Sequence, residues 1–121
     1  MGLAATKLDR TLLALADPTR RRVVELLRDE PRRAGELAAA VRMTPPAMSR
    51  HLKVLRKSGV VEEEGAEHDA RVRVYRLRRP ALAELGGWIQ EIEAFWTDQL
   101  GAFKAYAERT RPRAKKKATL S

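Results

Sequence analysis

RRAGELAAAVRMTPPAMSRHLKVLRKSG, residues 32–59, is the stretch that determines the fold of this chain. Residues 34–41 predict a short helix, because apolar side chains recur there at helical spacing. A short turn follows, and Thr44 with Pro45 directly after it is typical of a helix that begins with a side-chain cap. We therefore expect two helices joined by a short turn, the second of them over 45–58.

The second helix of this pair has an apolar side and a polar side. Met48, Leu52 and Leu55 fall at helical spacing and predict the buried side. The remaining positions include Ser49, Arg50, His51, Lys53, Arg56 and Lys57. A capped basic helix that directly follows a short helix is typical of proteins that place one helix in the DNA major groove.

Hydrophobic periodicity predicts further elements on both sides of this stretch. Helices are expected over 5–16 and 18–29, and two strands over 60–64 and 72–77 with a polar loop between them. A long helix is expected over 81–108. The predicted fold class is therefore mainly α with a β-hairpin wing. It is a winged helix-turn-helix in the order helix, helix, helix, helix, strand, strand, helix.

The net charge of +9 is distributed unevenly along the chain. Residues 17–58 hold eleven basic and five acidic side chains, whereas residues 80–108 hold one lysine and five acids. This asymmetry indicates a single surface that faces a polyanion. Residues 109–121 hold six basic side chains and no apolar pattern, and they predict a basic disordered tail.

The composition also argues against several classes of function. The chain has no cysteine and only two histidines, so we expect no disulfide, no thiolate chemistry and no metal site. It carries no catalytic set of nucleophile, base and acid, so we expect neither enzymatic activity nor a cofactor. No apolar run approaches the ~20 residues that span a bilayer, and the N-terminal segment does not read as a signal peptide. The expected location is the cytoplasm.

Base contacts are expected from the N-terminal half of the helix over 45–58, because that end of a recognition helix enters the groove. Arg50 can donate two hydrogen bonds to guanine, and Ser49 can contact a base edge or a phosphate. Candidates for phosphate contact include Lys57 and Arg20–Arg22. The residues of this segment that we predict to bind DNA are Thr44, Pro45, Pro46, Ala47, Ser49, Arg50, His51, Lys53 and Arg56.

Two interpretations stay open for each of three further side chains. His51 either hydrogen-bonds a phosphate or packs, partly buried, against the preceding helix. Arg71 and Arg73 on the second strand either bind the minor groove or DNA backbone, or they pair across the hairpin with Glu62 and Glu64. We include both arginines among the predicted DNA-binding residues.

The predicted long helix carries five of the six aromatic residues of the chain. Its apolar stripe is broader than one small domain needs, which indicates a second partner surface and a symmetric pair of chains. Burial within one chain and a pocket for a small-molecule effector are the alternatives. The residues predicted to form the dimer interface are Leu8, Leu12, Trp88, Ile92, Phe95, Trp96 and Phe103.

Taken in order, these segments resemble the ArsR family of bacterial winged helix-turn-helix repressors over roughly residues 5–108. The resemblance is carried by DPTRRRVVELL at 17–27, GELA at 35–38, PPAMSRHLKVLRKSGVV at 45–61 and VYRL at 74–77. It implies a homodimer whose first and last helices pack together, and repression at a near-palindromic operator. It also implies that the side chains at 45, 46, 49 and 50 face bases.

Many members of that family release DNA when a metal ion binds. The metal-sensing members commonly carry a cysteine-containing motif on the helix before the turn, where this chain has GELAAA at 35–40. Others use histidine and acidic ligands on the last helix, where this chain has acids but no histidine. The resemblance therefore implies a regulator of the type that does not sense metals.

We expect a sequence-specific DNA-binding transcriptional regulator, most simply a homodimeric repressor of an inverted-repeat operator. Residues 1–108 would form the domain that binds double-stranded DNA and dimerises. The alternative is a non-catalytic winged helix that binds a protein or RNA, since fold alone does not fix function. The basic recognition helix favours DNA.

Overall fold

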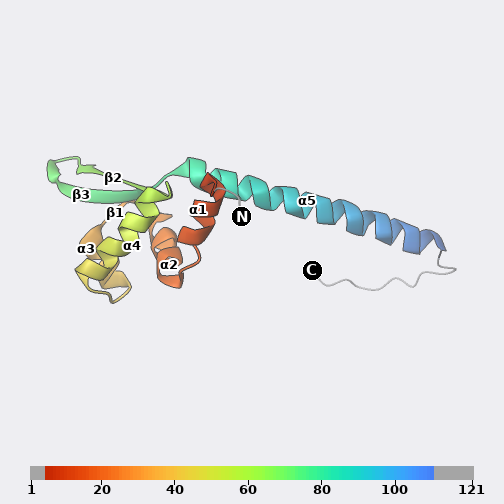
Figure 1. The fold of residues 1–121 in the computed structure, drawn as a ribbon, viewed down its shortest axis with the longest axis horizontal. Helices are drawn as coiled ribbons and strands as arrows, with labels where there is room; N and C mark the ends of the chain where they lie inside the picture. The colour runs from red at the N-terminus through yellow and green to blue at the C-terminus, as the bar shows by residue number, and fades with distance from the viewer. Residues whose placement is uncertain (1–4, 111–121) are drawn as a thin grey trace. The chain divides into compact units, whose positions relative to one another are not determined.

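The computed structural model of the chain describes residues 5–110. The elements are α1 Lys7–Ala14, α2 Pro18–Leu27, β1 Arg32–Arg33, α3 Ala34–Ala40, α4 Pro45–Lys57, β2 Val61–Ala66, β3 Asp69–Leu77 and α5 Arg79–Thr110 (Figure 1). The predicted order of helices and hairpin is confirmed. Most of the predicted basic tail, residues 111–121, lies outside the described residues, and 109–110 belong to α5.

The chain divides into two units at Gly86. The first unit contains α1 to β3 and the beginning of α5, and the second contains α5 from Gly87 onward. Among residues 5–110, every buried residue belongs to the first unit. The fold that presents a site is therefore that of the first unit.

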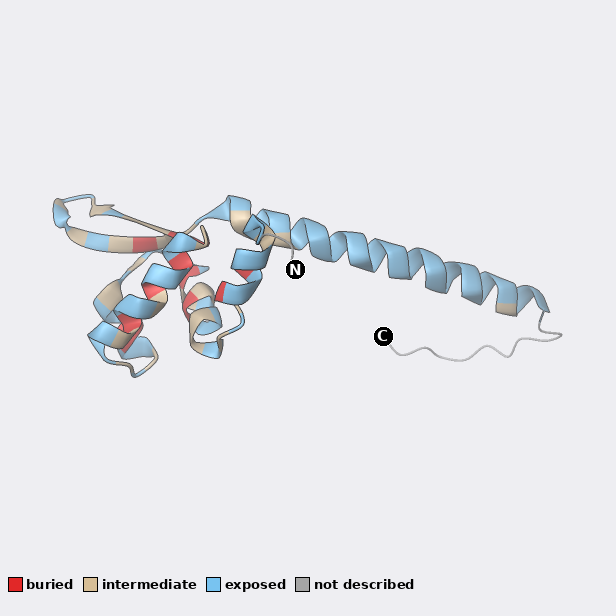
Figure 2. Ribbon diagram, in the orientation of Figure 1, coloured by how far each residue is buried: buried red, intermediate tan, exposed pale blue. Residues whose placement is uncertain are grey.

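Apolar side chains of α1, α2, α3, α4 and the sheet form the core of the first unit. Figure 2 marks the buried positions in red on the ribbon. The predicted inner stripe of α4 is confirmed, because Met48, Leu52 and Leu55 are fully buried. Val23 of α2 and Leu37 of α3 are also fully buried. Burying a leucine-sized side chain contributes about 1.5–3 kcal/mol, so this stripe holds α4 firmly in place.

The sheet has three antiparallel strands in the order β1-β3-β2. We did not predict β1, where Arg32 pairs with Tyr75 and Arg33 with Val74. Two residues directly after Pro31 are too few to show an alternating pattern. The hairpin strands extend beyond the predicted limits, and a register shift lies at Gly65 and Ala66.

The turn between α3 and α4 is closed by backbone hydrogen bonds. Met43 N donates to Ala38 O at 2.9 Å and Arg42 N donates to Ala39 O at 3.2 Å. This pattern is a Schellman motif, with Arg42 in the left-handed region at φ 55°. The predicted cap of α4 is present, since Ala47 N donates to Thr44 Oγ1 at 3.3 Å. Short links of this kind fix the direction in which α4 leaves the turn.

α4 ends close to its predicted limit, and a glycine in the left-handed region follows it. Gly59 has φ 82°, and Val60 N donates to Leu55 O at 3.0 Å. The same motif therefore closes both helices of the helix-turn-helix. Its second copy leads the chain directly into the wing.

α1 buries Thr11 and Ala14, whereas Leu12 is 39% and Leu13 68% exposed. Thr11 satisfies its hydroxyl by donating to Lys7 O at 3.1 Å. A threonine with an internal hydrogen bond thus takes a core position of α1, and Leu15 packs partly buried against the core. Leu12, which we predicted for the dimer interface, is left on the surface of the first unit.

Candidate nucleic-acid interface

The side of α4 opposite its buried stripe is exposed and basic. Pro45, Pro46, Ser49, Arg50 and Lys53 are all exposed. α4 has no acidic residue to pair with these side chains from within the helix. The sequence pattern predicted this surface, and the structure brings its members together on one face.

Two of the predicted base-contacting residues have local roles as well. Thr44 is exposed, but its hydroxyl accepts the hydrogen bond that caps α4. Ala47 is half-buried beside Met48. In the first two turns of α4, Ser49 and Arg50 are therefore the polar, exposed side chains that take no part in capping the helix.

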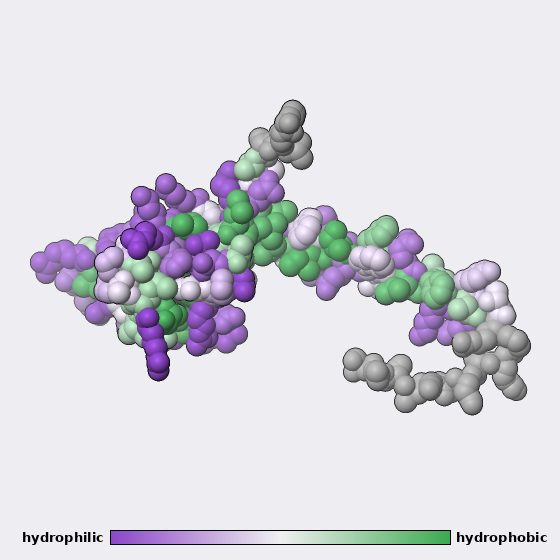
Figure 3. Space-filling model, turned by 60° about the horizontal axis from the view of Figure 1, so that its bottom comes forward, coloured by the Kyte–Doolittle hydropathy of each residue, from purple (hydrophilic) through white to green (hydrophobic). Residues whose placement is uncertain are grey.

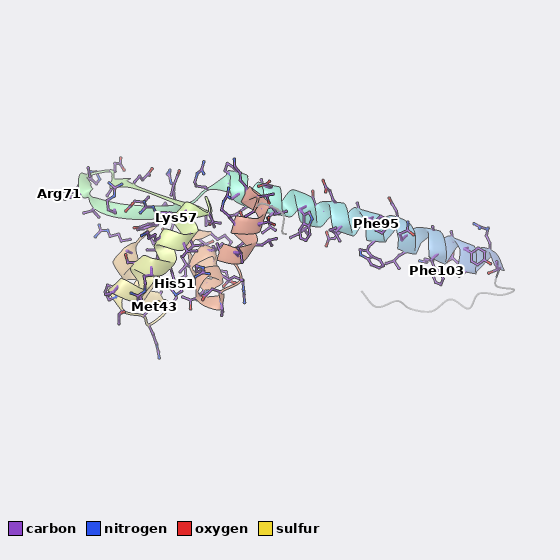
Figure 4. All side chains as sticks on the ribbon, in the orientation of Figure 1. Met43, His51, Lys57, Arg71, Phe95 and Phe103 are labelled. Carbon is purple, nitrogen blue, oxygen red and sulfur yellow. The ribbon has the colours of Figure 1, made fainter. Side chains whose placement is uncertain are left out.

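A hollow runs between α4 and the sheet. It is lined by Ser49, Lys53, Arg56, Lys57 and Tyr75. Lys57 and the side chains around it are drawn in Figure 4. A concave strip lined with cations and hydroxyl groups has the chemistry that binds phosphate oxygens.

Glu63 of β2 binds two of the predicted DNA contacts at the edge of this hollow. Arg56 Nη1 lies 2.9 Å from Glu63 Oε1, and Arg73 Nε lies 3.5 Å from Oε2. The hydroxyl of Tyr75 donates to Oε2 at 3.0 Å. Burial raises the pKa of Tyr75 above its ordinary value, and the hydrogen bond to the Glu63 carboxylate raises it further. The wing is thereby joined to the exposed side of α4.

We left open that Arg73 pairs across the hairpin with Glu62 and Glu64, and the structure shows a different partner. Arg73 pairs with Glu63, not with Glu62 or Glu64, because the register places Glu63 opposite Tyr75 on the face that Arg73 shares.

The other face of the hairpin carries a separate cluster of ion pairs. Glu62 and Glu64 both pair with Arg76, and Glu62 also pairs with Arg78. Sequence reasoning missed this cluster, since it depends on a one-residue choice of register.

Arg71 lies at the tip of the wing, and 90% of its side chain is exposed (Figure 4). It contacts Asp69 of the same strand at 3.2 Å, which differs from the predicted cross-strand pairing. The Arg71 side chain holds the pKa of Asp69 below its usual value. An exposed arginine at a hairpin tip remains available to DNA, since so exposed a pair contributes little.

His51 is half-buried, and its ring contacts Arg20 of α2. Its Nδ1 lies 3.2 Å from Arg20 Nη1. Arg20 also donates from Nε to Ala14 O at 2.6 Å, and Arg21 donates to Leu15 O at 2.9 Å. Two arginines predicted as phosphate contacts therefore cap the C-terminal end of α1, where cations are favoured.

The second unit carries the apolar stripe predicted for a dimer. Trp88 is 42%, Trp96 57% and Phe103 69% exposed, and no residue of α5 is buried. Figure 3 shows hydrophobic side chains along α5. Leu100 and Tyr106 were not among the predicted interface residues, although both follow the same spacing and each is 59% exposed. This much exposed apolar surface is typical of an interaction site.

No group of three or more His, Cys, Asp or Glu side chains among residues 5–110 could hold a metal ion. No helix in that range is long and apolar enough to cross a membrane.

A winged helix-turn-helix with an exposed basic second helix defines a class of DNA-binding regulators. Residues 17–63 match the family described as "Bacterial regulatory protein, arsR family". The chain is similar to the HTH-type transcriptional regulator Rv2034 of Mycobacterium tuberculosis, with 40% identity over 95 residues, 78% of this chain and 83% of that protein. It is also similar to the transcriptional repressor SdpR of Bacillus subtilis, with 34% identity over 50 residues, 41% of this chain and 56% of that protein.

A solved structure agrees with these relatives. The ArsR-like transcriptional regulator from Rhodococcus sp. RHA1 has a TM-score of 0.67 and 28% identity, covering 84% of this chain and 92% of that one. The chain belongs to the ArsR family of bacterial regulatory proteins, and it is a winged helix-turn-helix transcriptional regulator.

Proposed function

We propose that this protein is a homodimeric repressor that binds an inverted-repeat operator in double-stranded DNA. The outer face of α4 enters the major groove, Ser49 and Arg50 contact bases, and Lys53 and Lys57 contact phosphates. The protein acts on DNA in the cytoplasm, without catalysis and without a metal cofactor. Repression is supported by similarity to SdpR, which is named a repressor.

One observation carries the proposal: the exposed side of α4 presents Ser49, Arg50 and Lys53 together, with no acid from the same helix. The buried stripe on the other side fixes the helix in that orientation. A guanidinium at the N-terminal half of such a helix can donate two hydrogen bonds to guanine, worth about 1–3 kcal/mol of discrimination.

The dimer is supported by the exposed apolar side chains of α5 and by Leu12 of α1. Two identical chains related by a twofold axis present two α4 helices to successive turns of the same groove. An inverted repeat is the DNA counterpart of that symmetry.

Selection of duplexes from a random pool by the purified protein tests the proposal. We expect an inverted repeat whose half-sites lie about one helical turn apart. Recovery of no motif contradicts operator recognition. A preference for single-stranded RNA in competition would contradict DNA as the partner.

A further inference from the structure

Glu63 lies where the wing meets α4, and its carboxylate is only 19% exposed. It is the acidic partner of two of the cations that we predict to bind DNA, Arg56 and Arg73, at 2.9 and 3.5 Å. The Tyr75 hydroxyl fixes the carboxylate from a third direction. A carboxylate fixed beside a DNA-binding surface opposes binding, because it repels the phosphates of the DNA backbone.

The two arginines are not locked away. The side chain of Arg56 is 49% and that of Arg73 is 48% exposed. Arg56 also lines the hollow between α4 and the sheet. A carboxylate and a phosphate are alike to a guanidinium, since both accept paired, charge-assisted hydrogen bonds. Each arginine must therefore loosen its pair with Glu63 to bind a phosphate fully.

We propose that Glu63 is a positioning residue that limits the affinity for DNA by competing with backbone phosphates for Arg56 and Arg73. The proposal rests on the proposed function and concerns the sequence-independent part of binding, since the phosphates are the same in every duplex. With Glu63 present, the protein leaves unrelated DNA sooner. The contacts of α4 with bases are unaffected, so discrimination between sequences stays the same.

The other two acids of the same strand provide matched controls. Glu62 and Glu64 carry the same charge and are also paired with arginines. They lie on the opposite face of the hairpin from Glu63. Replacing one of them removes the same charge without releasing Arg56 or Arg73.

The test compares wild type with Glu63→Gln, which keeps the size of the side chain and can still accept the hydrogen bond from Tyr75. Binding to the selected operator and to an unrelated duplex is measured by fluorescence anisotropy over a range of salt. We expect Glu63→Gln to raise both affinities by roughly 3–10-fold and to steepen the salt dependence by about one phosphate contact. Glu62→Gln should change either affinity by less than about twofold, because it frees neither Arg56 nor Arg73.

Arg56→Gln supplies the second comparison. If Glu63 acts through Arg56, the gain from Glu63→Gln is smaller in the Arg56→Gln background. Should Glu63→Gln unfold, Glu63→Asp withdraws the carboxylate by one methylene and is expected to give a smaller gain of the same sign.

Three results overturn the role of Glu63: an unchanged or weaker affinity in Glu63→Gln, an equal gain in Glu62→Gln, or a gain that is undiminished in the Arg56→Gln background. The first would make Glu63 a purely structural link, and the second would reduce its effect to net charge. A wild-type protein that binds no duplex overturns the proposed function itself, which is a distinguishable failure.

Discussion

Arg42 adopts a backbone conformation that few side chains favour. Its φ of 55° closes the Schellman motif between α3 and α4, a position usually held by glycine. A side chain with a Cβ in the left-handed region costs about 1–2 kcal/mol. The site is therefore built on a turn that carries local strain.

Arg42→Gly is expected to stabilise the protein by about 0.5–1 kcal/mol, because the relief of strain exceeds the added entropy of the unfolded chain. Thermal unfolding measures it. Arg42→Ala is the matched control, since it removes the same guanidinium but keeps the Cβ, and it should give no such gain. A less stable Arg42→Gly would show that the arginine side chain itself supports the turn.

Asp17 makes stability depend on pH at the start of α2. Its carboxylate accepts hydrogen bonds from Arg20 N and Thr19 N. These bonds hold the pKa of Asp17 below the usual value, and the bond from Arg20 has the larger effect. A carboxyl group whose pKa is lower in the folded state stabilises the fold fully above its unfolded pKa. That contribution is lost as the pH falls through the folded-state pKa.

We therefore expect the free energy of unfolding to decrease below about pH 4, and this decrease to be smaller in Asp17→Asn, which caps α2 without titrating. Urea denaturation between pH 3 and pH 7 measures both. Identical pH profiles of wild type and Asp17→Asn would contradict the assignment.

At the scale of elements, the sequence predicted every helix and both wing strands, because each has a periodic pattern or a capping residue. It missed β1, whose two residues pair with β3 only through the tertiary fold. It also did not predict that Thr11 of α1 takes a core position. Local sequence is enough to predict that a helix forms, whereas the face that a short helix buries depends on the elements packed against it.

The same division holds for the candidate site. Spacing alone predicted that Ser49, Arg50 and Lys53 would share one exposed face of α4. No local pattern could assign Glu63 to Arg56, or Arg20 to the end of α1, since these partners come from separate elements. Charged side chains are the hardest to place from a sequence, because many partners lie within their reach.

The wing depends on Gly65. A Cβ on this residue would lie 2.8 Å from Ala70 Cα and 2.9 Å from Ala70 O. Both are backbone atoms that cannot move aside cheaply. Gly65→Ala should therefore destabilise the protein by about 1–3 kcal/mol and disturb the hairpin.

Gly35→Ala is the control for this substitution. A Cβ at Gly35 meets nothing within 4 Å, and the residue lies in α3. We expect it to stabilise the fold by up to about 1 kcal/mol. Chemical denaturation of both variants checks the contrast, and equal effects would contradict the close approach at Gly65.

At the scale of the whole molecule, the exposed apolar stripe of α5 predicts association. Trp96→Glu places a charge within the stripe and is expected to convert the dimer to a monomer, as measured by light scattering after gel filtration. Thr97→Glu adds the same charge about 100° around the helix and should leave the dimer intact. An unchanged mass for Trp96→Glu would show that this stripe is not the interface.

If the outer face of α4 reads DNA sequence, the side chain of Arg50 must set the preference for the operator. Affinity for the selected operator and for an unrelated duplex is measured for wild type, Arg50→Lys and Arg50→Ala, each verified as folded and dimeric. We expect Arg50→Lys to lose roughly 10–100-fold on the operator but little on unrelated DNA, because it keeps the charge and loses the paired hydrogen bonds. An Arg50→Ala protein that binds the operator as tightly as wild type would show that α4 does not read bases through Arg50.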